Sequence, residues 1–164
     1  MLVKDKLHPD VPAWEVEIPQ GINIDPYKLD YKLQDGSLFK KITTRFENHN
    51  EHLKQSILDL LDVNYIKQMV PEYNTVDIRI FKDLPGFKLV PHCDVLEHKA
   101  FIMFNLIDNV NSTTFYDRFE KLLCEAPNKK YTGIFHLLHT KPRIMHAIEN
   151  KSKVDRYTTI AFIK

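Results

Sequence analysis

From residue 75 to the C-terminus the sequence repeats one pattern, and this pattern limits the folds that the chain can adopt. Short runs of apolar and β-branched residues alternate with clusters of Gly, Pro, Asn, Asp and Ser, as strands alternate with tight turns. Strands are predicted over 75–82, 87–94, 99–107, 113–116, 131–138, 143–149 and 154–163, with a short helical or irregular excursion at 118–123. The run 99–107 is apolar on both faces except at Asn105, which is typical of a central strand. A β-sandwich or small barrel is therefore expected.

The N-terminal part has a different pattern. Residues 13–18 alternate apolar and charged side chains, which predicts a half-buried strand, and residues 38–42 form an element whose type the pattern leaves open. Asn48 or Asn50 is then positioned to cap a helix, and Pro71 marks the end of this helix or of a short second segment. The helix presents one apolar stripe made of Leu53, Ile57, Leu60 and Leu61. The sequence thus predicts a helical layer outside the β-rich part.

Length and composition predict one soluble unit. The 164 residues are expected to form a single domain, 1–164, with strands and a supporting helix in 1–74 and a barrel core in 75–164. The net charge of +1 argues against nucleic acid or an anionic membrane as a partner. No apolar run reaches the roughly 18 residues of a membrane span, and the first residues lack the apolar segment of a signal peptide. Two cysteines without a CxxC spacing fit a reducing cytosol, so a cytoplasmic location is expected.

His92 and Asp94 lie at the end of the predicted strand 87–94, with Cys93 between them. Because side chains alternate along a strand, the imidazole and the carboxylate point to the same side. A second imidazole would complete the two-His-one-carboxylate face that leaves half of an Fe(II) coordination sphere open. His146, on a separate predicted strand, is the candidate for this third ligand, which would make 75–164 a metal-binding core.

A cation and a hydroxyl follow His146 in the last predicted strand. Arg156 lies ten positions after His146, and Thr158 shares its face of the strand. A guanidinium binds a carboxylate through two parallel hydrogen bonds, so this pair is a suitable receptor for the far end of a dicarboxylate that chelates the metal. The other histidines are weaker candidates: hydrogen-bonded structural groups are expected at His136 and His139, and solvated ones at His49, His52 and His98.

The segment 76–164 resembles the Fe(II)/2-oxoglutarate-dependent dioxygenase superfamily, whose members carry a His-x-Asp pair, a distal His and then an Arg or Lys. The strings Leu-Pro-Gly at 84–86, Thr-Gly-Ile-Phe at 132–135 and Pro-Arg-Ile-Met-His at 142–146 agree with it. The resemblance implies a mainly β fold, the double-stranded β-helix or jelly-roll/cupin-like barrel, with an N-terminal helical layer. It implies catalytic iron ligands at His92, Asp94 and His146, and a cosubstrate site at Arg156 and Thr158. Asn105 is either a third residue of that site or a structural polar group.

Three features depart from the family pattern. Phe81 stands where many relatives carry a Tyr whose hydroxyl contacts the cosubstrate, and residues 111–115 are Asn-Ser-Thr-Thr-Phe in place of Gly-Gly-Glu-Thr. Arg156 replaces the Lys that prolyl hydroxylases of the superfamily generally use, which favours another branch. The metal ligands are unaffected, so the departures concern the cosubstrate pocket.

The predicted activity is that of an Fe(II)/2-oxoglutarate-dependent oxygenase. With Fe(II), O2 and 2-oxoglutarate as cosubstrate, it would hydroxylate a C–H bond of a peptide side chain or small metabolite and release succinate and CO2. One alternative is a non-catalytic cupin-like domain that binds a metal or a small acid. Another is a β-rich interaction domain without a metal. Substrate identity and oligomeric state are not encoded in any recognisable pattern.

Overall fold

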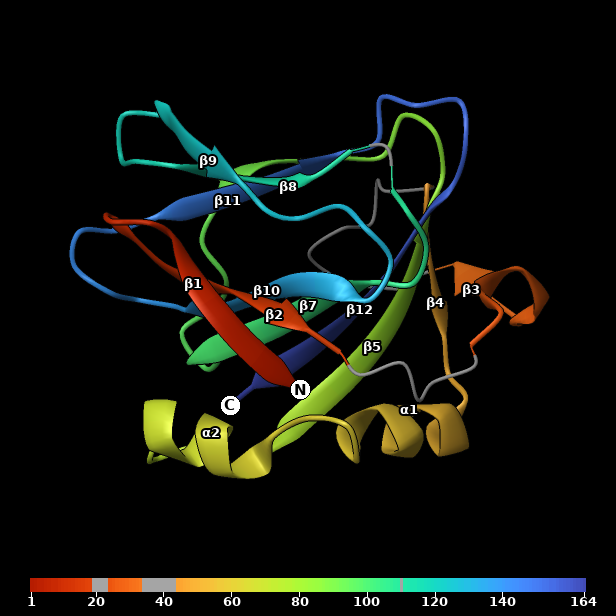
Figure 1. Ribbon diagram of the computed structural model, residues 1–164. Coiled ribbons are helices and arrows are strands. Elements are labelled where there is room, and N and C mark those ends of the chain that lie inside the picture. Colours follow the sequence, from red (N-terminus) through yellow and green to blue (C-terminus); the bar gives the residue numbers. More distant parts are fainter. Residues whose placement is uncertain (19–23, 34–43, 110) are drawn as a thin grey trace.

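The computed structural model describes residues 1–18, 24–33, 44–109 and 111–164. It contains two antiparallel sheets, one with the strand order β1-β2-β10-β7-β12-β5-β4-β3 and one with the order β6-β11-β8-β9 (Figure 1). The helical segments are the 3-10 helix η1 (Pro26–Lys28), α1 (Glu51–Leu58) and α2 (Val63–Met69). The strands are β1 (Leu2–His8), β2 (Val11–Glu17), β3 (Lys32–Leu33), β4 (Arg45–Asn48), β5 (Val76–Asp83), β6 (Lys88–His92), β7 (Ala100–Asn105), β8 (Thr113–Tyr116), β9 (Leu122–Glu125), β10 (Thr132–Leu137), β11 (Met145–Glu149) and β12 (Arg156–Ile163).

The predicted mainly β fold is confirmed, and each strand predicted after residue 75 is present. The prediction for 118–123 was wrong at its end, because the chain turns there and enters β9. Strands β1, β3 and β4 were also missed. β1, β3 and β9 are sheet edges with largely exposed side chains, so they lack the alternation that marks a half-buried strand. The element predicted at 38–42 lies outside the described residues.

Helices α1 and α2 cover one face of the eight-stranded sheet (Figure 1). Asn50 caps α1 by accepting a hydrogen bond from the backbone N–H of Leu53, one of the two caps predicted. The short second segment before Pro71 is α2, which Asp62 caps in the same way. The helices bury Ile57 and Ile66 in a core that also includes Ile80, Phe104 and Ile163 of the sheet.

The other face of the eight-stranded sheet faces the four-stranded sheet. The second core fills the space between them and includes Phe81, Phe101, Met103, Phe115, Ile134 and Ile160. Because side chains alternate, this same face of β12 carries Arg156 and Thr158. Asp83 of β5 lies opposite Arg156 on one side and opposite Arg45 of β4 on the other. Buried charged groups therefore lie between the two sheets.

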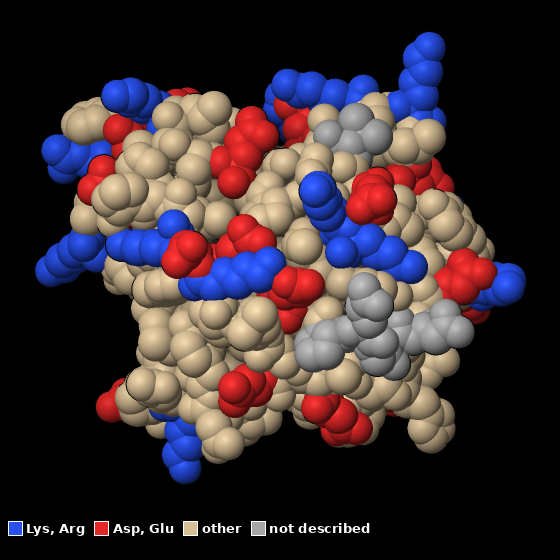
Figure 2. Space-filling model, in the orientation of Figure 1, with Lys and Arg blue, Asp and Glu red and all other residues tan. Residues whose placement is uncertain are grey.

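Basic and acidic side chains are interspersed on the surface seen in Figure 2, as the net charge of +1 suggests. Among the described residues, no helix has both the length and the apolar character needed to cross a membrane.

Candidate metal centre

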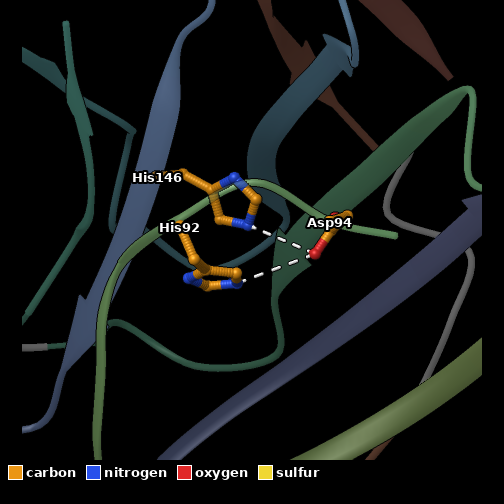
Figure 3. Close-up of side chains that lie close together, drawn as sticks. All are labelled: His92, Asp94 and His146. Carbon is orange, nitrogen blue, oxygen red and sulfur yellow. Dashed lines mark ion pairs between the residues drawn. The ribbon is translucent and has the colours of Figure 1, made fainter. Parts of the chain in front are cut away.

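His92, Asp94 and His146 lie side by side between the sheets (Figure 3). His92 ends β6 and is paired directly with His146 of β11, which places their ring centroids 4.5 Å apart. The chain then leaves the strand, and Asp94 approaches both rings. Its Oδ1 lies 3.7 Å from Nε2 of His92 and 3.7 Å from Nε2 of His146. One ligand atom from each residue lies within 4.8 Å of the others.

The position of Asp94 corrects one step of the sequence argument. β6 ends at His92, so Asp94 is not part of the strand. Its place beside His92 comes from the path of the chain after the strand and not from the alternation of side chains within it. The two residues nevertheless face one another as predicted.

Several atoms of this cluster have no partner of their own. Nδ1 of His92 lies 2.8 Å from the carbonyl oxygen of Val90 and must donate to it, because a carbonyl only accepts. In neutral His92 this leaves Nε2 with a lone pair directed toward the carboxylate. Oδ2 of Asp94 and Nδ1 of His146 are buried without a hydrogen-bond partner among the described residues. The atoms that face one another are Nε2 of both rings and Oδ1 of Asp94, and acceptors that converge in this way are stabilised by a cation between them, so the donor set fits a divalent metal.

The pKa shifts agree with this interpretation. Burial would raise the pKa of Asp94, but the two imidazoles outweigh burial and lower it, so the carboxylate is ionised. Burial lowers the pKa of His146 to about 4, and this ring is neutral at physiological pH. Burial also opposes protonation of His92, yet the neighbouring Asp94 and the Val90 carbonyl give it a raised pKa. Since a metal binds only the deprotonated form of a ligand, it would compete with a proton at His92, whereas the other two ligands are already deprotonated.

A cavity of about 580 Å³ extends from this cluster between the sheets. Its walls are mainly apolar, and Val90 and Val95 form part of them while remaining 60% and 44% exposed. Other residues along the cavity include Phe81, Phe101, Met103, Ile160, Phe162 and Arg45. The candidate ligands thus lie in an apolar space with access to solvent, as a small-molecule site requires.

The other predicted site residues lie outside this cavity lining. Arg156 is only 2% exposed, and its Nη1 donates to Asp83 at 3.1 Å. Thr158 lies on the predicted face and is fully buried, with no partner for its hydroxyl among the described residues. Asn105 is used structurally: its amide nitrogen donates to the carbonyl oxygens of Pro127 and Thr132. These contacts agree with the structural alternative for Asn105, and its role in a cosubstrate site stays a prediction.

Two histidine predictions were wrong. His98 was expected in solvent, but its ring stacks on Phe162 at 4.5 Å and lines the cavity. His136 was expected to be hydrogen-bonded, but it is 1% exposed and neither ring nitrogen has a partner among the described residues. It packs instead at right angles to the rings of Phe101 and Phe115. Burial lowers the pKa of His136 to about 3. His49, His52 and His139 are exposed.

Arg45 and Asp83 were not predicted as site residues. The bidentate contact between them has Nε–Oδ1 and Nη2–Oδ2 distances of 2.6 and 2.9 Å. Asp83 follows the predicted strand 75–82, and Arg45 precedes the predicted helix in a stretch without a recognisable period. No local signal connects residues 38 positions apart in this way.

The fold is shared with Fe(II)/2-oxoglutarate oxygenases of known structure. The chain is similar to a prolyl hydroxylase from Trichoplax adhaerens in complex with a hypoxia inducible factor oxygen degradation domain peptide fragment. The TM-score is 0.66 at 8% identity, over 94% of this chain and 84% of that one. It is also similar to an oxidoreductase of the 2OG-Fe(II) oxygenase family from Burkholderia pseudomallei, with a TM-score of 0.59 at 12% identity over 84% and 73% of the two chains. A prolyl-4-hydroxylase from Pseudomonas putida gives 0.56 at 9%, over 76% and 75%.

No protein-family model matches the sequence, and no curated protein matches it. The structural similarities confirm the double-stranded β-helix fold that the resemblance implied, in the form of two facing antiparallel sheets. At such low identity they concern the fold, so the activity has to be argued from the residues of the site.

Proposed function

We propose that the protein is an Fe(II)/2-oxoglutarate-dependent oxygenase that hydroxylates a C–H bond and releases succinate and CO2. One observation carries this proposal: two imidazoles and a carboxylate converge at an apolar cavity between the sheets, with Oδ2 of Asp94 buried and unpaired among the described residues. This donor set is typical of non-haem Fe(II) oxygenases. The fold is the one in which the neighbouring oxygenases are built.

His92, Asp94 and His146 would hold the iron. Fe(II) and 2-oxoglutarate, when bound, supply the oxidative decarboxylation that drives hydroxylation. The chain supplies fixed ligands, because the Val90 carbonyl orients the ring of His92 and the strand pairing orients that of His146. The apolar walls, among them Phe101 and Ile160, limit water near the reacting groups.

A peptide side chain is the substrate class with most support. The Trichoplax neighbour is described with a bound peptide fragment. In this chain the exposed apolar residues Val90 and Val95 border the cavity, where they could contact an extended backbone next to the reacting side chain. A small metabolite that fits within about 580 Å³ is the second class.

The test uses the purified full chain with Fe(II), ascorbate and 2-oxoglutarate, and measures succinate by mass spectrometry. We expect metal-dependent succinate formation that Asp94→Ala abolishes. His52→Ala, which removes an exposed histidine of α1, is the matched control and should retain it.

Binding measurements separate the alternatives. Calorimetric titration with Mn(II), followed by 2-oxoglutarate, should show two successive binding events. Binding of Mn(II) alone would support a cupin-like metal-binding domain and contradict the oxygenase proposal. A chain that binds neither would be a β-rich domain without a metal site.

A further inference from the structure

Two arginines between the sheets share one buried carboxylate. Asp83 is fully buried, and its Oδ2 accepts from Nη2 of Arg45 at 2.9 Å and from Nη1 of Arg156 at 3.1 Å. Arg45 adds a second bond, from Nε to Oδ1, at 2.6 Å. A guanidinium can bind a second carboxylate if it has N–H donors available. The available donors of Arg45 and Arg156 therefore decide which of the two can bind one.

Each nitrogen of the Arg156 guanidinium already has an acceptor. Besides its bond to Asp83, its Nη2 lies 3.3 Å from the hydroxyl of Thr113 and 3.7 Å from the sulfur of Met103. Its Nε lies 3.4 Å from the carbonyl oxygen of Asn111. All three nitrogens therefore have acceptors inside the protein, and the side chain does not line the cavity. Arg156 functions as a structural counter-ion in this arrangement.

The donors of Arg45 are only partly occupied. Nε and Nη2 are bound to Asp83, whereas Nη1 has no acceptor among the described residues. The guanidinium contacts two aromatic rings, 4.3 Å from the ring centre of Phe81 and 4.1 Å from that of Phe87. Arg45 lines the same cavity as the candidate metal ligands. The group is thus packed against two aromatic rings and held along one edge by Asp83, while its Nη1 is available for a further acceptor.

The local charge favours a singly charged anion. Arg45 and Arg156 carry two positive charges against the single negative charge of Asp83, which leaves one in excess in a buried setting. Glu47, the next inward-facing acid on β4, lies 4.0 Å from His49 and has no ion pair with either arginine. Because an unbalanced buried charge is costly, one added carboxylate at Nη1 of Arg45 would stabilise the cluster.

We infer that Arg45, and not Arg156, binds the distal carboxylate of the cosubstrate, while Asp83 and Arg156 hold the Arg45 guanidinium in position. This inference rests on the proposed function, because it assumes that 2-oxoglutarate chelates the metal at the other end of the cavity. It assigns the specificity for a dicarboxylate to β4, a strand that belongs to the N-terminal part of the chain.

The experiment compares two keto acids that differ at the distal end. The Mn(II)-loaded protein is titrated with 2-oxoglutarate and with 2-oxopentanoate, which has a methyl group in place of the distal carboxylate. The wild-type protein should bind 2-oxoglutarate about 10- to 100-fold more tightly, the range for a hydrogen bond to a charged group. Arg45→Gln should lose this preference while its affinities for Mn(II) and 2-oxopentanoate remain those of the wild type.

Three further variants test whether Arg45 alone sets the preference for 2-oxoglutarate. Arg45→Lys retains the charge without the planar donor edge and should show an intermediate preference, so it also serves if Arg45→Gln fails to fold. Arg156→Lys should keep the preference close to that of the wild type. Arg79→Gln removes another cation from the cavity wall, one already paired with Asp77 at 3.0 Å, and is the matched control.

Loss of the preference in Arg156→Lys or Arg79→Gln, with Arg45→Gln unaffected, would overturn the inference and leave the proposed function standing. A wild-type protein that binds Mn(II) but neither keto acid would instead overturn the proposed function. Circular dichroism of each variant establishes that the comparison is made between folded proteins.

Discussion

The two charged clusters between the sheets are built in opposite ways. At the His92–Asp94–His146 cluster the ion-pair distances are 3.7 Å, too long for hydrogen bonds, and Oδ2 of Asp94 is unpaired among the described residues. At the Arg45–Asp83–Arg156 cluster the carboxylate accepts bonds of 2.6, 2.9 and 3.1 Å. The first cluster therefore has acceptor atoms available for a ligand. In the second cluster the acceptor atoms of Asp83 are already hydrogen-bonded to the two arginines.

This difference shows that burial of charge alone does not mark a binding site. Both clusters contain an aspartate in contact with two basic side chains, and both are largely buried. What separates them is whether the acceptors are satisfied. The same substitution, aspartate to asparagine, should therefore affect stability at one cluster and metal binding at the other.

The largest effect is expected for Asp83→Asn. Removing the negative charge leaves two guanidinium groups buried with only a neutral acceptor, and breaking a buried pair typically costs about 3–5 kcal/mol. The free energy of unfolding, measured by urea denaturation of the metal-free protein, should fall by this amount. Asp77→Asn is the control: its partner Arg79 is partly exposed, so the expected loss is below about 1 kcal/mol. Equal losses would mean that Asp83 is not the key group of its cluster.

Asp94→Asn should have the converse effect. Removing one of three ligands and its charge should weaken Mn(II) binding at least about 100-fold, more than changes to residues that only orient the ligands do. The free energy of unfolding of the metal-free protein should change by less than about 1 kcal/mol, because the ion pairs of Asp94 with other described residues are long. Calorimetry and urea denaturation of the same preparation measure both quantities. A variant that unfolds more easily yet keeps its metal affinity would contradict the assignment of the two clusters.

Most of the fold could be predicted from the sequence because its signals are local. The alternation in β5 and β12, the apolar run of β7 and the cap at Asn50 each depend on neighbours within a few positions. Edge strand β1 gave no such signal, since one row of its side chains does not have to be apolar.

The candidate site could also be predicted where its residues give local signals. The prediction failed where residues far apart in the sequence are brought together by the fold. His92 and Asp94 are near neighbours, and His146 was predicted from its place on a separate strand with the family resemblance in agreement, so the cluster could be anticipated. The pairing of Arg45 with Asp83 joins strands 38 positions apart through register in the sheet, which no local pattern encodes. The resemblance also pointed to Arg156 for the cosubstrate, whereas only the packing reveals that each nitrogen of its guanidinium already has an acceptor.

His136 gives the smallest expected effect and extends the comparison to a neutral buried group. It has no hydrogen-bond partner among the described residues, and burial lowers its pKa from 6.5 to about 3. The unfolded chain therefore takes up a proton below pH 6.5 that the folded protein refuses until about pH 3, so stability falls as the pH falls through this window. Between pH 7.5 and pH 5 this difference amounts to about 2 kcal/mol.

Replacing the ring by an apolar one of similar shape, in His136→Phe, should remove that part of the acid sensitivity. Urea denaturation of the metal-free protein at the two pH values should show a wild-type loss that exceeds the loss of the variant by about 2 kcal/mol. Burial also lowers the pKa of His146, to about 4, so the variant should retain some acid sensitivity. His52→Ala, on the exposed surface of α1, should behave like the wild type. If His136→Phe loses as much stability between the two pH values as the wild type, His136 is not the source of this acid sensitivity and the prediction is wrong.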